Sequence, residues 1–128
     1  MSLEIYQEMI LEHYKNPNNS GILTDADVTS KDYNPSCGDL IEIRIKFDNG
    51  KINEIKFQGQ GCAISLSSVD ILIDLVKNKN IEEIKNLSVE NFLRTLGIEL
   101  SPLRLKCALL GLKTLKTAVY TYLGSLSE

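Results

Sequence analysis

The chain has 128 residues, of which 43% are hydrophobic and 24% charged, which favours one domain over residues 1–128. The net charge of −3 argues against electrostatic binding of nucleic acid or of an anionic membrane. No apolar run approaches the ~20 residues that span a bilayer, and the N-terminal sequence does not resemble a signal peptide. Three cysteines, an odd number, do not match the disulfide framework of a small secreted domain. We therefore expect a cytoplasmic protein with free thiols.

The first third of the chain predicts a helix and then an extended strand. Apolar residues, among them Ile5 and Ile10, recur at helical spacing from Leu3 to Tyr14, and the sequence Asn-Pro-Asn-Asn ends this pattern. Residues 25–33 are polar with little periodicity, so we expect an edge strand there. It leads into the turn-forming sequence at 34–39.

The clearest local pattern is a β-hairpin. Apolar and polar residues alternate over 41–47, and Asn49-Gly50 then predicts a type I′ turn. In the return strand the apolar spacing slips by one residue between Ile52 and Ile55. Since such a slip would place a carboxylate on the apolar face, we expect a β-bulge near Asn53-Glu54.

The second half of the chain predicts helices. An apolar segment over 65–77 predicts a largely buried helix. Ser88 is expected to begin a short helix that ends at Gly97, and Ser101-Pro102 to begin a last helix that runs to about Leu123. Early strands and late helices favour an α+β fold. We expect a small antiparallel sheet of about three strands, with helices packed on one face and a long C-terminal helix.

The cysteines are the candidate functional residues. Cys37 and Cys62 lie among glycines, which allow a backbone to approach a ligand closely. Cys107 falls well away from the centre of the predicted apolar stripe of the last helix, although a cysteine acting only as a small hydrophobe would lie within it. Asp39 is either a turn residue or a ligand. The four groups would suffice for a tetrahedral ion or for a two-iron, two-sulfur cluster, but their spacing does not establish that they converge.

Four segments in this order carry a resemblance to a known family. They are Glu-His-Tyr-Lys-Asn-Pro at 12–17, Asn-Pro-Ser-Cys-Gly-Asp at 34–39, Gly-Gln-Gly-Cys-Ala-Ile-Ser at 59–65 and Ser-Pro-Leu-Arg-Leu-Lys-Cys at 101–107. Over nearly its whole length the chain resembles the IscU/SufU (NifU N-terminal-like) family of iron–sulfur cluster assembly proteins.

The resemblance implies a scaffold. A cysteine desulfurase would deliver sulfur, iron would join it, and a transient 2Fe–2S cluster would be built and passed to apo iron–sulfur proteins or to a carrier. The family's ligands match Cys37, Asp39, Cys62 and Cys107. Such a scaffold is a carrier more than an enzyme.

The chain combines features of two branches of the family. Lys106 stands where the IscU branch typically has a histidine, and the sequences Arg-x-Lys-Cys and Gly-x-Gly-Cys resemble SufU, which binds Zn²⁺ and accepts sulfur by ligand exchange. The 44 residues between Cys62 and Cys107, however, resemble the shorter IscU arrangement. The alternatives are therefore a zinc-dependent sulfurtransferase that uses the same four ligands, or a domain whose metal is only structural.

Several roles stay open at the level of sequence. Cys107 and Cys37 are both candidate persulfide acceptors, and Lys106 is either a solvated charge or a cation that favours the thiolate of Cys107. His13 is interpreted as structural or interfacial rather than as a metal ligand. The single proline of 101–104, where the IscU branch has Leu-Pro-Pro-Val-Lys, argues against recognition by the dedicated Hsp70-type chaperone. A homodimer around a shared cluster is also open.

Overall fold

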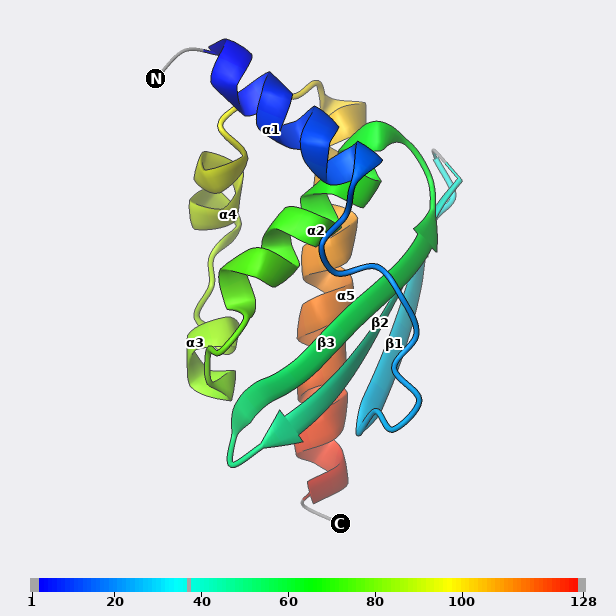
Figure 1. The fold of residues 1–128 in the computed structure, drawn as a ribbon, viewed down its shortest axis with the longest axis vertical. Helices are drawn as coiled ribbons and strands as arrows, with labels where there is room; N and C mark the ends of the chain where they lie inside the picture. The colour runs from blue at the N-terminus through cyan, green and yellow to red at the C-terminus, as the bar shows by residue number, and fades with distance from the viewer. Residues whose placement is uncertain (1–2, 37, 127–128) are drawn as a thin grey trace.

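An antiparallel sheet with the order β1-β2-β3 is formed by β1 (Val28–Asn34), β2 (Asp39–Asp48) and β3 (Lys51–Gln60) (Figure 1). The structure, a computed structural model, describes residues 3–36 and 38–126. Alternate side chains of β2 are buried, and these are Asp39, Ile41, Ile43, Ile45 and Phe47. Because successive side chains of a strand point to opposite faces, the sheet has one buried face, and the first residue of β2 on that face is a carboxylate.

The hairpin between β2 and β3 has the predicted turn and the predicted bulge. Asn49 and Gly50 both have positive φ, 52° and 77°, as a type I′ turn requires. Lys46 pairs with Glu54 and Phe47 pairs with Ile52, so the residue between the two β3 partners is extra. The bulge keeps both Ile52 and Ile55 on the buried face.

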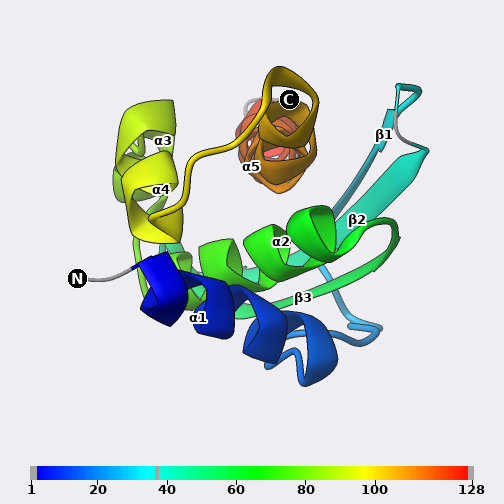
Figure 2. The ribbon, with the colours of Figure 1, turned by 90° about the horizontal axis from the view of Figure 1, so that it is seen from above.

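The helices are α1 (Leu3–Lys15), α2 (Ala63–Val76), α3 (Ile81–Lys85), α4 (Val89–Leu96) and α5 (Pro102–Leu126). Viewed from above, α5 lies in the hollow of the curved sheet, where it packs on β1, β2 and α2 (Figure 2). Helix α2 covers β3, and α1 packs mainly on α2. This arrangement confirms the predicted α+β fold with its long C-terminal helix. None of the described helices combines the length and the apolar character that crossing a membrane needs.

Two short helices follow α2, and only the second was predicted. Helix α4 begins after Ser88, whose side chain accepts from the Asn91 N–H, and ends at Gly97 with a φ of 71°, as expected. Helix α3 is stabilised by a capping box in which Asn80 and Glu83 exchange side-chain and backbone hydrogen bonds. The Asn-x-x-Glu spacing is the signal that could have predicted it.

The buried face of α5 is wider than predicted, and this corrects the interpretation of Cys107. The apolar stripe from Leu105 to Leu123 placed this cysteine outside the buried face, whereas its residue surface is only 1% exposed. Helix α5 has neighbours on several sides, so small and weakly polar residues are buried beside the leucines. These additional buried residues are Cys107, Gly111, Thr114 and Ala118.

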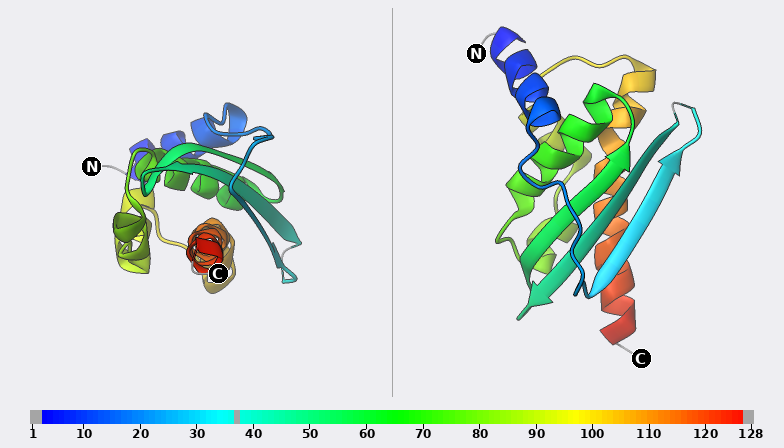
Figure 3. Two further views of the ribbon diagram at one scale, coloured as in Figure 1. Left: turned by 90° about the horizontal axis from the view of Figure 1, so that it is seen from below. Right: turned by 45° about the vertical axis from the view of Figure 1, so that its right-hand side comes forward.

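The N-terminal segment also departs from its predicted pattern. Ile10 of α1 is buried, but Ile5 and Tyr14 of the predicted apolar stripe are 51% and 44% exposed. After α1 the chain runs beside the free edge of β3, where Gly21 donates to the carbonyl of Phe57 at 2.9 Å. It then crosses the outer side of the sheet to reach β1 (Figure 3).

Candidate metal and cluster site

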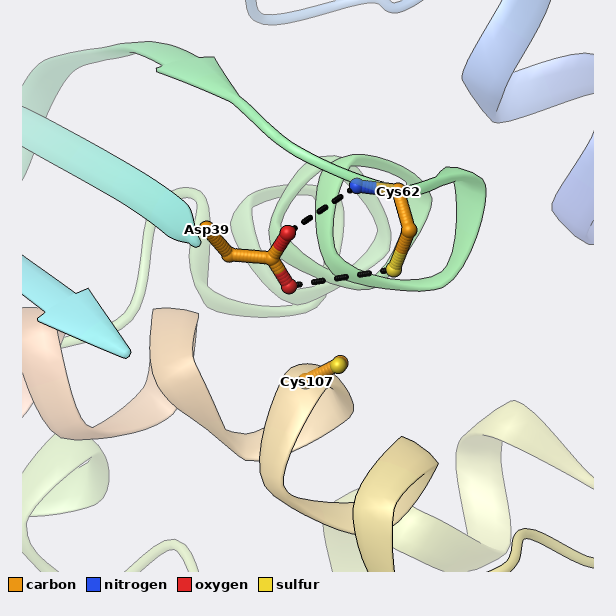
Figure 4. A group of neighbouring side chains, drawn as sticks. All are labelled: Asp39, Cys62 and Cys107. Atoms are coloured by element: carbon orange, nitrogen blue, oxygen red, sulfur yellow. Dashed lines mark hydrogen bonds between the residues drawn. The ribbon is translucent and has the colours of Figure 1, made fainter. Parts of the chain in front are cut away.

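Three elements that are distant in sequence bring ligand atoms together at one end of the sheet (Figure 4). Asp39 is the first residue of β2, Cys62 precedes α2, and Cys107 lies in the second turn of α5. One carboxylate oxygen of Asp39 and the two Sγ atoms all lie within 4.8 Å of one another. Asp39 and Cys107 are each 1% exposed and Cys62 is half-buried, so the group is accessible mainly at Cys62.

The carboxylate of Asp39 is oriented by the backbone that precedes α2. Its Oδ1 accepts from the Cys62 N–H at 3.1 Å, and its Oδ2 lies 3.7 Å from the Cys62 Sγ. A buried carboxylate is costly unless hydrogen bonds compensate for lost water. Oδ1 is therefore held by a backbone hydrogen bond, and Oδ2 faces the thiol of Cys62.

Cys62 occupies the N-cap position of α2 in an extended conformation, with φ −77° and ψ 168°, and its side chain makes no capping hydrogen bond. The first N–H groups of a helix have no intrahelical acceptor, and they carry the positive end of the helix dipole. An anionic ligand is therefore favoured at this position.

Two glycines allow the elements to come this close. A Cβ atom at Gly61 would collide with Oδ1 of Asp39 and with the hydroxyl of Ser65. A Cβ at Gly111 of α5 would lie 2.9 Å from the Cβ of Val69, so this glycine lets α5 approach α2 one turn after Cys107. Both close contacts depend on the absence of a side chain.

The structure thus brings together three of the four predicted ligands. Cys37, the fourth, lies outside the described residues, in the sequence between β1 and β2. The chain on either side of it returns to the site, because Asn34 pairs with Asp39 and accepts from the Gly38 N–H at 2.8 Å.

Lys106 directly precedes Cys107 on α5. Its side chain is exposed and lines an open pocket of about 310 Å³ between the end of β1 and α5, together with Tyr33, Pro35 and Leu109. A second lysine of this pocket, Lys113, forms an ion pair with Asp32 at 3.3 Å.

A second polar group ties the N-terminal segment to α2. Nδ1 of His13 lies 2.6 Å from Oδ2 of Asp70, a side chain with no exposed surface. The same carboxylate accepts the N–H groups of Asn18 and Asn19 and the side-chain amide of Asn19, at 2.9–3.1 Å. The carboxylate therefore has a full set of hydrogen-bond donors. Ligand atoms of His13, Asp70 and Asp74 also lie within 4.8 Å of one another, so the structural role of His13 stays a prediction. Asp70 was not predicted, because nothing local distinguishes it from a surface aspartate.

Asp74, one turn beyond Asp70, borders this group. Its partial burial opposes ionisation, but hydrogen bonds from Asn19, Asn18 and Lys77 and the charge of Lys77 outweigh that effect, so the pKa of Asp74 is lowered.

The donor set suits a metal ion or a cluster. Ligands of a tetrahedral zinc ion with Zn–S bonds of about 2.3 Å lie roughly 3.7 Å apart, and the described atoms already lie within 4.8 Å. Thiolates are also the usual ligands of iron–sulfur clusters, whereas a carboxylate is a harder ligand. An α+β domain with these three converging side chains therefore has a candidate site for a metal ion or a cluster.

Comparison with known proteins identifies the family. Residues 5–127 match the NifU-like N terminal domain, so the chain belongs to that family, and the predicted resemblance is confirmed. The chain is 33% identical to the zinc-dependent sulfurtransferase SufU of Bacillus subtilis over 132 residues, covering 90% of this chain and 89% of that protein. It is 37% identical to the iron–sulfur cluster assembly scaffold protein IscU of Aquifex aeolicus over 125 residues, covering 96% and 78%.

The fold agrees with a solved structure of a relative. FiSufU of the thermophile Fervidobacterium islandicum AW-1 superposes with a TM-score of 0.78 at 31% identity, covering 93% of this chain and 99% of that chain. The NifU-like protein of Brucella abortus, at 15% identity and a TM-score of 0.76, shares the fold.

Proposed function

We propose that this chain is a scaffold on which 2Fe–2S clusters are assembled from iron and from sulfur supplied by a cysteine desulfurase, and from which they are transferred to apo-proteins or a carrier. The observation that carries the proposal is the meeting of Asp39, Cys62 and Cys107, with ligand atoms within 4.8 Å, at one end of the sheet. The proposed fourth ligand is Cys37. The setting is the reducing cytoplasm, in which free thiols persist.

The carboxylate makes this set of ligands suitable for release. Cys62 and Cys107 supply soft thiolates that bind iron firmly, whereas Asp39 binds through a harder oxygen. Oδ1 of Asp39 accepts from the Cys62 N–H, and Oδ2 lies 3.7 Å from the Cys62 Sγ, so Oδ2 is the oxygen that we propose to bind iron. A single carboxylate oxygen is the ligand that an incoming thiolate of an acceptor protein would displace first.

Sulfur would enter as a persulfide. The thiolate of Cys107 or Cys37 attacks the outer sulfur of the desulfurase persulfide, a new S–S bond forms, and the desulfurase cysteine leaves as a thiolate. Lys106, which lines the open pocket between the end of β1 and α5, is proposed to stabilise the thiolate of Cys107. The cluster itself is cargo, and two chains could share it as a homodimer.

The alternative is a zinc-dependent sulfurtransferase. It is favoured by the lysine at position 106 and by 33% identity to a relative with that name. Bound Zn²⁺ would hold its cysteine ligands as thiolates at neutral pH. Cys37, Asp39, Cys62 and Cys107 would be the ligands, and the persulfide would reach the same two candidate cysteines.

Anaerobic reconstitution distinguishes these functions. The purified protein is analysed for metal and incubated with a cysteine desulfurase, cysteine and ferrous iron, and visible absorption is then followed. The scaffold function requires cluster absorption that transfers to an apo-ferredoxin and is lost in Cys62→Ser. Ser67→Ala, a buried serine in α2 whose hydroxyl donates to the Ala63 carbonyl, is the matched control.

Other outcomes would replace the proposal. Stoichiometric zinc, no cluster and zinc-dependent stimulation of the desulfurase would establish the transferase. Tight zinc with neither activity would leave only a structural metal.

A further inference from the structure

Ser65 lies beside the candidate site but is not one of its proposed ligands. It is the third residue of α2, and its surface is 1% exposed. Its Oγ donates to the carbonyl of Cys62 at 3.1 Å and lies 3.7 Å from the Sγ of the same cysteine, with the thiol as donor. A small hydroxyl is thus buried against a proposed sulfur ligand.

The donor and the acceptor in the contact between the Cys62 Sγ and the Ser65 Oγ must exchange roles when Cys62 binds a metal. A metal-bound cysteine is a thiolate and has no proton to donate. The hydroxyl proton of Ser65 is then the group that can make the hydrogen bond, by rotating from the Cys62 carbonyl to Sγ. The carbonyl keeps a partner after that rotation, because it also accepts from the Leu66 N–H at 3.2 Å. The rotation therefore leaves no buried acceptor unpaired.

We propose that Ser65 is a positioning residue whose hydroxyl donates a hydrogen bond to the Cys62 thiolate when that sulfur holds a metal or a cluster. The inference rests on the proposed role of Cys62 as a ligand. The Ser65 contact holds Sγ from the α2 side, while Oδ2 of Asp39 lies 3.7 Å from the same sulfur. Gly61 makes this possible, since a side chain there would displace both the hydroxyl and the carboxylate.

Helix α2 offers a matched control. Ser67 is equally buried, and its hydroxyl donates to the carbonyl of Ala63 at 2.5 Å, but no described contact joins it to a cysteine. Ser65→Ala and Ser67→Ala each remove one buried hydroxyl from the same helix. A difference between them in metal binding therefore reports on the sulfur contact and not on helix stability.

The test uses the metal-free full chain. Zn²⁺ is titrated in competition with a chromophoric chelator, and the sulfur-to-metal charge-transfer band is recorded after loading with Co²⁺. Ser65→Ala should weaken zinc binding roughly tenfold, as losses of hydrogen bonds to metal ligands commonly do. It should also shift the cobalt band to lower energy, because a thiolate without its hydrogen bond has higher-energy lone pairs.

The controls make the result decisive. Ser67→Ala should match the wild type in both measurements, and Ser65→Thr, which keeps the hydroxyl, should stay closer to the wild type than Ser65→Ala. If Ser65→Ala leaves zinc affinity and the cobalt band unchanged while the wild type binds both ions, the role of Ser65 is refuted and the ligand role of Cys62 stands. If the wild type and Cys62→Ser bind both ions identically, both proposals fail.

Discussion

The backbone N–H of Cys62 donates to Oδ1 of Asp39 at 3.1 Å and so joins the start of α2 to the first residue of β2. This bond links two proposed ligands directly and does so through a main-chain group. Substitution of the cysteine side chain therefore need not remove the support for the carboxylate. The two residues can be tested separately.

Asp39→Ala should slow cluster transfer several-fold, provided that the variant still assembles a cluster. The reason is that without Asp39 the remaining proposed protein ligands are thiolates, which an incoming thiolate displaces from iron less readily than it displaces the harder carboxylate. Transfer to an apo-ferredoxin, followed by visible circular dichroism, is the measurement. Asp32→Ala, an aspartate on β1 that pairs with Lys113, is the control. Unchanged or faster transfer would contradict the proposed role.

Gly61→Ala should disrupt the site, because the new Cβ collides with Asp39 and Ser65. We expect weaker zinc binding and little cluster formation, measured by chelator competition and visible absorption. Gly111→Ala tests the packing of α5 on α2 separately, since its Cβ would lie 2.9 Å from the Cβ of Val69. That variant should lose about 1–3 kcal/mol in the free energy of unfolding through overpacking. Wild-type zinc affinity in Gly61→Ala would show that the close approach is dispensable.

Asp70→Ala should be strongly destabilising although it lies outside the candidate site. The substitution leaves the backbone N–H groups of Asn18 and Asn19 without their acceptor and His13 without its carboxylate partner. Each buried donor left without an acceptor costs about 1–3 kcal/mol, so the combined loss should be several kcal/mol. Urea unfolding of the metal-free protein measures the loss, with Asp25→Ala, an exposed aspartate, as the control. If Asp70→Ala lowers the free energy of unfolding by less than Asp25→Ala does, the structural role of Asp70 is wrong.

Asp74 should contribute to acid sensitivity. Its pKa is lowered from 3.8 in the folded protein, so its contribution to stability is present above pH 3.8 and is lost as the pH falls through the lower folded value. The difference in unfolding free energy between the wild type and Asp74→Asn should therefore be constant from neutral pH to about pH 5 and shrink below pH 3.8. Because this side chain is partly exposed, the effect should be small and should weaken at high salt. A difference that grows as the pH falls would contradict the assignment.

Lys106→Ala should leave stability nearly unchanged, within about 0.5 kcal/mol, because the side chain is exposed. If the ammonium supports the thiolate of Cys107, sulfur transfer from the desulfurase should slow in this variant. Lys113→Ala, which removes the other lysine of the same pocket, is the matched control. Persulfide formation, followed by mass spectrometry, measures the effect. Equal transfer rates in the two variants would assign Lys106 to the solvated surface.

Local chemistry explains which parts of the fold the sequence predicted. The Asn49-Gly50 turn, the bulge after Ile52 and the caps at Ser88 and Gly97 depend on the residues themselves and their nearest neighbours. Such signals are readable without knowledge of the rest of the chain. The missed helix α3 also had a local signal in Asn80 and Glu83.

The burial of Cys107 and the network at Asp70 depend on long-range packing. A helical wheel identifies the leucine side of α5, but the position of the helix in the hollow of the sheet decides that Cys107 and Thr114 are buried as well. Asp70 becomes a buried acceptor only because the segment after α1 folds back onto α2.

The sequence by itself determined the composition of the site: three cysteines, one aspartate after the first of them, and motifs that identify the family. Tertiary structure decided that Asp39, Cys62 and Cys107 meet. The two described cysteines are separated by 44 residues in sequence, and the packing of α5 against α2 and the sheet brings them together. It also decided which atoms face one another. The Cys62 N–H donates to Oδ1 of Asp39, and Oδ2 of the same carboxylate lies 3.7 Å from the Cys62 Sγ.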